Sequence, residues 1–78
     1  MYTEKELARF CRNIMNLRKI HGLSKAKMAV ILGISCKTLE ILESGTIPKR
    51  LSCEVIVNAA NYFNISPHQL FINEIHTE

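Results

Sequence analysis

The segment SKAKMAVILGISCKTLEILESG, residues 24–45, most constrains what this chain can fold into. It holds two short helical patterns that meet at Gly33, and each pattern follows its own capping residue, Ser24 or Ser35. A helix of about eight residues is marginal by itself, so both must be held by packing. Ala29 and Gly33 are small enough to let two helices cross closely at a tight turn. The segment therefore predicts two crossed helices, the second anchored from behind by Leu39 and Leu42 with its outer face free.

Three further helical patterns flank this segment. The capping-box sequence Thr3 to Glu6 opens an apolar stripe at helical spacing that ends near Gly22. After a loop that contains Pro48, Ser52 caps a fourth pattern that ends at Asn64, and Ser66-Pro67 opens a short fifth one. We expect an all-α fold of five helices in one domain over residues 1–78, with its core at about 4–72 and a frayed tail at 73–78.

Charge is distributed unevenly along the chain. Of its 78 residues, all ten Lys and Arg and four Glu lie in residues 1–50, whereas residues 51–78 hold three Glu and no basic residue. A basic first part and an acidic last part favour contact with a polyanion on one side of the molecule only. Ordinary solvated charge on helix faces would explain the same pattern, because the net charge of +3 is mild.

The sequence offers no constellation of catalytic or metal-binding residues. It contains no Asp, its three histidines have no HExxH or Cys/His spacing, and its three cysteines form no CxxC pair. We therefore expect no enzyme activity, metal or cofactor, reduced thiols in a cytoplasmic protein, and core positions for Cys11 and Cys53. No signal sequence is visible, and the longest apolar run, MAVILGI, is too short to cross a membrane.

Residues 24–45 resemble the helix–turn–helix of lambdoid phage repressors and Cro, the xenobiotic-response-element family. The matching features are Ala29, Gly33 and Ile34, the apolar pair Leu39 and Leu42, and the ending Glu43-Ser44-Gly45. The flanking sequences LRKIHGLS and ISPHQLF resemble the family as well, so that the similarity covers roughly residues 7–72. The resemblance implies a sequence-specific binder of double-stranded DNA that regulates transcription as a repressor. It also implies that the protein is encoded by a bacterium or phage and acts at the nucleoid.

The resemblance also implies roles for particular residues. The base-reading positions of the second motif helix, residues 36–44, fall on Cys36, Lys37, Glu40 and Ile41. Lys37 suits guanine and Ile41 suits a thymine methyl, whereas Glu40 either accepts from cytosine or pairs with Lys37 one helical turn away. Phosphate contacts fall on Lys25, Ser44, Thr46, Lys49 and Arg50. Arg18 and Glu43 match a pair that joins the first helix to the third, which predicts a salt bridge.

Members of the family usually bind a palindromic operator as a homodimer. We expect the dimer contact in the apolar, acidic last third of the chain, at Tyr62, Phe71, Ile72 and Ile75, whereas Phe63 and Leu70 belong in the core. No small-molecule ligand and no membrane partner is expected. Two alternatives keep the same fold: an interaction module whose exposed helix binds a protein, and an autoregulator of the antitoxin type.

Overall fold

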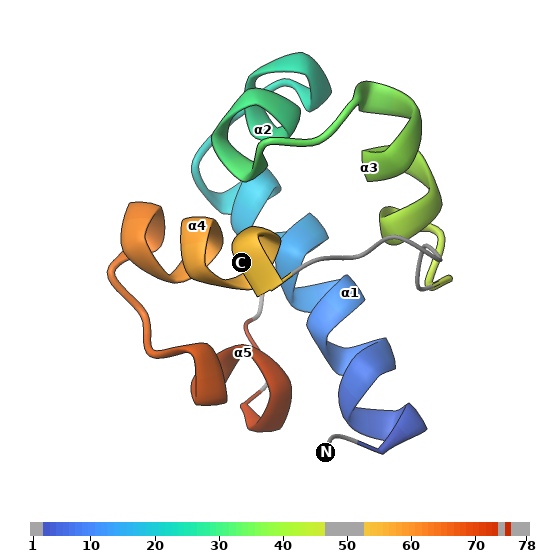
Figure 1. Cartoon of the computed structure of the whole chain (residues 1–78), viewed down its shortest axis with the longest axis vertical. Helices are drawn as coiled ribbons and strands as arrows, with labels where there is room; N and C mark the ends of the chain where they lie inside the picture. The colour runs from blue at the N-terminus through green and yellow to red at the C-terminus, as the bar shows by residue number, and fades with distance from the viewer. Residues whose placement is uncertain (1–2, 47–52, 74, 76–78) are drawn as a thin grey trace.

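The computed structural model describes residues 3–46, 53–73 and 75 of the 78-residue chain. Five helices follow one another along these residues, and the described part of the chain contains no strand (Figure 1). They are α1 (Glu4–Ile20), α2 (Lys25–Leu32), α3 (Cys36–Glu43), α4 (Cys53–Phe63) and α5 (Pro67–Ile72). The all-α fold expected from the sequence is confirmed.

The helix boundaries follow from local capping chemistry. Thr3 and Glu6 form a capping box at α1, and Ser66 and Gln69 form a second one at α5, so each pair satisfies two free backbone N–H groups. Asn64 directly follows the last residue of α4. Its φ of 55° is a left-handed conformation that asparagine tolerates better than most residues. These ends agree with the sequence prediction. The predicted cap Ser52 and the loop residue Pro48 lie outside the described residues.

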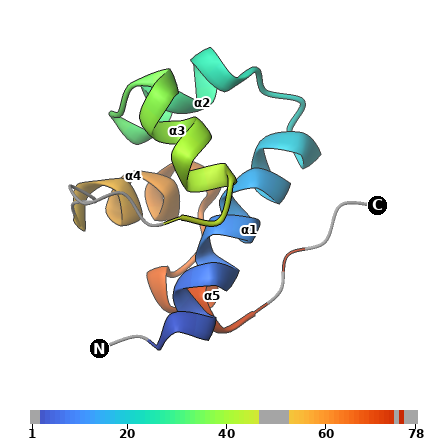
Figure 2. The ribbon, with the colours of Figure 1, turned by 90° about the vertical axis from the view of Figure 1, so that its right-hand side faces the viewer.

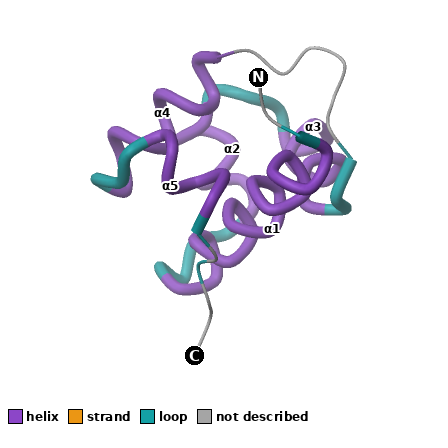
Figure 3. Tube along the Cα trace, turned by 90° about the horizontal axis from the view of Figure 1, so that it is seen from below, coloured by secondary structure: helices purple, strands orange, loops and turns teal. Residues whose placement is uncertain are grey.

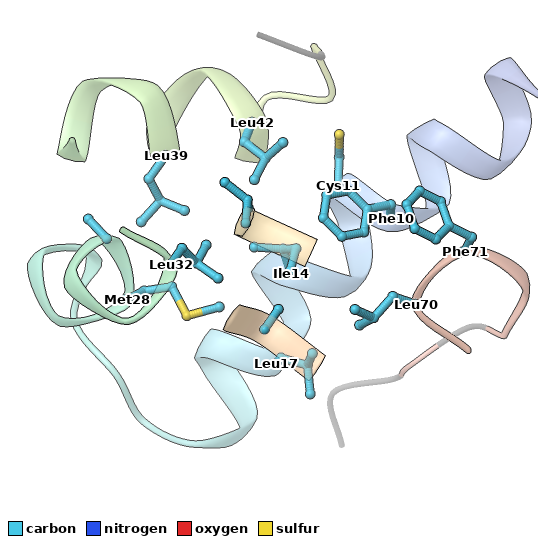
Figure 4. Packing of buried hydrophobic residues seen from close by; sticks show 13 residues of the cluster. Phe10, Cys11, Ile14, Leu17, Met28, Leu32, Leu39, Leu42, Leu70 and Phe71 are labelled. Carbon is cyan, nitrogen blue, oxygen red and sulfur yellow. The ribbon is translucent and has the colours of Figure 1, made fainter. Parts of the chain in front are cut away.

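The core forms around α1. Figure 4 shows Phe10, Ile14 and Leu17 of α1 pointing toward apolar side chains of the other helices, all of them buried. The rings of Phe10 and Phe71 stack with their centroids 4.8 Å apart. Seen from below, α1 and α3 lie together on one side and α4 on the other, with α5 between them (Figure 3). The other helices supply the rest of the core: Met28, Ala29, Leu32, Leu39, Leu42, Val55, Ala59, Leu70 and Phe71.

A row of polar side chains on α1 holds the C-terminal segment. The Asn13 amide, 1% exposed, donates to the carbonyl oxygens of Leu70 at 2.8 Å and Asn73 at 2.7 Å, and its oxygen accepts from the N–H of Ile75 at 2.9 Å. On the same side of α1, Arg9 donates to the Ile72 carbonyl and Asn16 to the Ile75 carbonyl. Asn73 and Ile75 are therefore bonded to α1 by partly buried hydrogen bonds, within the tail that the sequence predicts to be frayed.

Candidate nucleic-acid interface

Gly33 makes the turn between α2 and α3. Its φ of 74° lies in the left-handed region, where residues with a Cβ are strained, and its N–H bonds to the carbonyls of the last turn of α2. Asn58 of α4 donates to the Leu32 carbonyl at 3.1 Å and so satisfies another free group at the end of α2. Ser35 then accepts from the Thr38 N–H at 3.1 Å and starts α3. The turn is thus fixed by hydrogen bonds within the motif and from α4.

Helix α3 is anchored by its inner face and open on its outer face. Leu39 and Leu42 are fully buried against the core. All the residues expected to face bases are exposed, and Ile41 is 38% exposed although it is apolar. An α-helix with one face free fits the width of the DNA major groove. The exposed set is Cys36, Lys37, Glu40, Ile41 and Ser44.

An ion pair fastens α3 to α1. The Arg18 Nε lies 2.7 Å from the Glu43 Oε2, and a second bond joins the Arg18 Nη2 to the Glu43 Oε1 at 3.1 Å. The same guanidinium donates to the Leu23 carbonyl at 3.2 Å, in the connection that leads to α2. Two parallel bonds fix orientation as well as distance. Arg18 therefore ties the end of α3 to α1 and to the approach of the motif, in the pairing that the sequence predicts.

Glu40 lies near a basic residue that the sequence analysis did not consider. Its carboxylate is 3.9 Å from the Lys25 ammonium at the start of α2, so of the two alternatives left open for Glu40, the ion pair with Lys37 on the same helix is not the one formed. The side chains of Lys25 and Glu40 are 50% and 61% exposed, and such a pair is weak in water. Lys25, a predicted phosphate contact, thus lies beside a predicted base-reading residue, and both face away from the core.

The predicted phosphate contacts are only partly described. Lys25, Ser44 and Thr46 are all exposed, whereas Lys49 and Arg50 lie outside the described residues. The Ser44 hydroxyl donates to the Ile41 carbonyl at 2.6 Å, which closes the end of α3. A phosphate could accept from the Ser44 hydroxyl only in place of the Ile41 carbonyl.

The predicted dimer residues divide between surface and core. Tyr62 is 53% exposed and Ile72 38% exposed, and Ile75 is half-buried beside α1. Phe71 is 1% exposed and stacks on Phe10, so its prediction as an interface residue is wrong. Its side chain fills the space between α1 and α5 and has no surface left for a partner.

The three cysteines also differ in burial. Cys11 lies in the core as expected, and burial raises the pKa of its thiol. Cys53 is exposed at the first position of α4, so the prediction that it fills the core is wrong. Cys36 is exposed at the first position of α3. Within residues 3–46, 53–73 and 75, no cluster of metal-ligating side chains is present, and no helix is long and apolar enough to cross a membrane.

Asn13 is the structurally important residue that the sequence interpretation missed. It is fully enclosed and binds three backbone groups of the C-terminal segment. A signal for it exists in the sequence, because residue 13 falls on the apolar stripe formed by Phe10, Ile14 and Leu17. A polar side chain at such a position has to find hydrogen-bond partners inside the fold.

Comparisons with known proteins agree with this geometry. Residues 12–74 match the Cro/C1-type HTH DNA-binding domain. The fold is similar to that of the restriction-modification controller protein C.AhdI from Aeromonas hydrophila, with a TM-score of 0.67 and 28% identity over 83% of this chain and 96% of that one. It is also similar to a transcriptional regulator from Listeria innocua, with a TM-score of 0.69 and 29% identity over 88% of this chain and 64% of that one. A comparison with curated proteins gave no match. The chain belongs to the family of Cro/C1-type helix–turn–helix DNA-binding domains.

Proposed function

We propose that this DNA-binding domain is a transcriptional repressor that binds a palindromic operator as a homodimer. The observation that carries the proposal is the mounting of α3. Leu39 and Leu42 hold its inner face in the core, the ion pair with Arg18 holds its end, and its outer face is free. A helix mounted in this way can enter the major groove without losing any contact that holds the fold together.

The exposed side chains of α3 suggest what the helix recognises. Lys37 can donate to the O6 and N7 of guanine, and Ile41 can contact the methyl group of thymine. Glu40 can accept from the N4 of cytosine, and its exposed pair with Lys25 is weak enough for Lys25 to bind a phosphate instead. We therefore expect guanine beside thymine in each half-site, with the phosphates bound by residues around the ends of α2 and α3.

We propose that the dimer contact involves Tyr62, Ile72 and Ile75. Tyr62 and Ile72 are large side chains left exposed near the ends of α4 and α5, and aromatic residues are enriched in interfaces. A two-fold dimer would place its half-sites about 34 Å apart, which is one turn of DNA. An occupied operator then blocks polymerase, which requires no chemistry and no cofactor.

The test is selection of bound duplexes from a random pool by the purified protein. We expect enrichment of a palindrome, two protomers per duplex by sedimentation, and weaker binding after Lys37→Ala but not after the control Lys27→Ala. Lys27 is exposed on α2, and we propose no DNA contact for it. Replacing thymine by uracil at the preferred step should weaken binding of the wild type and leave Ile41→Ala unaffected. Binding without any sequence preference would overturn the proposal.

A further inference from the structure

The outward side of α1 carries a row of basic side chains that the proposed function does not use. Lys5, Arg12 and Lys19 follow one another at intervals of seven residues, and all three are exposed. Seven residues are close to two helical turns, so these side chains lie along one line on the helix. At 1.5 Å per residue the row is about 21 Å long.

Lys5, Arg12 and Lys19 have no acidic partner among the residues that the structure describes. The ion pairs within residues 3–46, 53–73 and 75 are Arg18 with Glu43 and Lys25 with Glu40, and neither includes a residue of the row. Glu6, on α1 itself, is bonded to the N–H of Thr3 at the N-cap. The row therefore presents positive charge that no described carboxylate neutralises by direct contact.

Two hollows in the surface connect Lys5 and Arg12 of this row to the end of α3. A hollow of about 220 Å³ lies between Ala8, Arg12 and Met15 of α1 and residues 43–45 at the end of α3. A second hollow of about 220 Å³ is lined by Lys5, Ala8, Arg9 and Arg12. The two hollows share Ala8 and Arg12, so they form one surface, which we call the α1 furrow.

The α1 furrow begins beside Ser44, a predicted phosphate contact, and runs along the first half of α1. In Figure 2, α3 lies above the N-terminal turns of α1 on the side of the molecule that faces the viewer. The one carboxylate in its wall, that of Glu43, is bound by Arg18, and its side chain is only 7% exposed. An anion in the furrow would therefore meet guanidinium and ammonium groups rather than a free carboxylate.

We propose that the α1 furrow binds the sugar-phosphate backbone of the DNA duplex whose groove α3 enters. This inference rests on the proposed function and adds a second contact surface to it. DNA is favoured over an acidic protein because its charges repeat along a line, with one phosphate per about 3.4 Å of each strand. Protein interfaces are instead centred on buried aromatic and apolar side chains, and the α1 furrow is lined by none except Ala8 and Met15.

The test compares Lys5→Ala/Arg12→Ala with Lys27→Glu, which changes the net charge by the same amount elsewhere. Binding to the selected operator is measured across a salt series, and phosphate ethylation interference maps the phosphates that matter. Losing two phosphate contacts lowers the slope of log K against log salt by about 1.8, equivalent to about 60-fold in affinity at 0.1 M salt when the curves meet at 1 M. The double variant should also lose interference at particular phosphates, and Lys27→Glu should keep it.

Each outcome decides the proposal. If the slope and the interference pattern of the double variant equal those of Lys27→Glu, the α1 furrow does not bind the backbone and is free for an acidic protein. If the wild type selects no sequence, the proposed function fails. The same two variants on a duplex of arbitrary sequence then still test the furrow, because phosphate contacts do not depend on sequence. Lys5, Arg12 and Lys27 are all exposed, so the thermal unfolding of both variants should equal that of the wild type.

Discussion

Replacing Glu43 by Gln tests how strongly the ion pair with Arg18 holds α3 in place. The substitution keeps the shape of the side chain and removes its charge. The guanidinium then faces one neutral amide oxygen and one NH2 group in place of the carboxylate at 2.7 Å, and it keeps its bond to the Leu23 carbonyl. The side chains of Arg18 and Glu43 are 15% and 7% exposed. The arginine is therefore left in a place where water replaces the lost carboxylate poorly.

The expected loss lies between two known limits. Breaking a fully buried pair costs about 3–5 kcal/mol, whereas an exposed pair contributes about 0.2–1 kcal/mol. Because this pair is mostly enclosed and bonded twice, we expect Glu43→Gln to lower the free energy of unfolding by about 2–3 kcal/mol. For a domain of this size that corresponds to a fall in Tm of roughly 10–20 °C.

Urea unfolding followed by circular dichroism measures this loss, and the double variant Arg18→Met/Glu43→Leu separates its causes. With both charges gone, apolar side chains fill the same space, and most of the lost stability should return. A value for Glu43→Gln within about 0.5 kcal/mol of the wild type would refute the reasoning, because it is the range of an ordinary surface substitution. A double variant less stable than the single one would refute the assignment of the loss to an unpaired charge.

Three further predictions concern the turn, the N-cap and the C-terminal segment. Gly33→Ala should lower the free energy of unfolding by about 1–2 kcal/mol in urea melts, since a Cβ at φ of 74° is strained and would lie 3.3 Å from the Asn58 amide. Gly22→Ala, with similar φ and open space around it, isolates the strain, and a smaller loss at residue 33 than at residue 22 would contradict the role of this contact. Hydrogen bonds at the N-cap hold the pKa of Glu6 below its ordinary value of 4.5. Because the folded pKa is the lower one, this contribution to stability is present above about pH 4.5 and is lost as the pH falls through the folded value. Thermal melts in acid should show Glu6→Gln to be less pH-dependent than the wild type, and equal dependence would contradict the capping role. Asn13→Ala leaves three backbone groups without this partner and should lower the free energy of unfolding by about 2–4 kcal/mol. Hydrogen exchange at the Ile75 amide, which donates to Asn13, should become faster. Unchanged exchange there would show that the segment is held by other contacts.

The sequence predicts the helices well because their ends are decided locally. Thr3, Ser24, Ser35 and Ser66 each accept from a backbone N–H three residues later, and this chemistry depends only on neighbouring residues. Gly33 is likewise recognisable, since few other residues adopt its left-handed conformation without strain. The outward side of α3 follows from the helical spacing of Leu39 and Leu42 in the same way.

The errors concern contacts between distant parts of the chain. Phe71 and Ile72 are neighbouring apolar residues, and only the position of α1 decides that the first is enclosed and the second exposed. Glu40 pairs with Lys25 because the turn at Gly33 brings the start of α2 near α3, whereas spacing along one helix suggested Lys37. Periodicity tells which side of a helix is apolar, and it does not tell what covers that side.

The anchoring of the C-terminal segment by α1 has a consequence for how this surface can evolve. Arg9, Asn13 and Asn16 bind backbone oxygens of residues 70–75 and the N–H of Ile75, and none of these bonds involves a side chain of the segment. Substitutions at Ile72 or Asn73 thus leave the hydrogen bonds to α1 in place. At Ile75, only a substitution by proline would remove a backbone group that is bonded to α1. At the dimer contact proposed for this segment, two copies of the gene could accordingly diverge one substitution at a time, while each product kept the same fold.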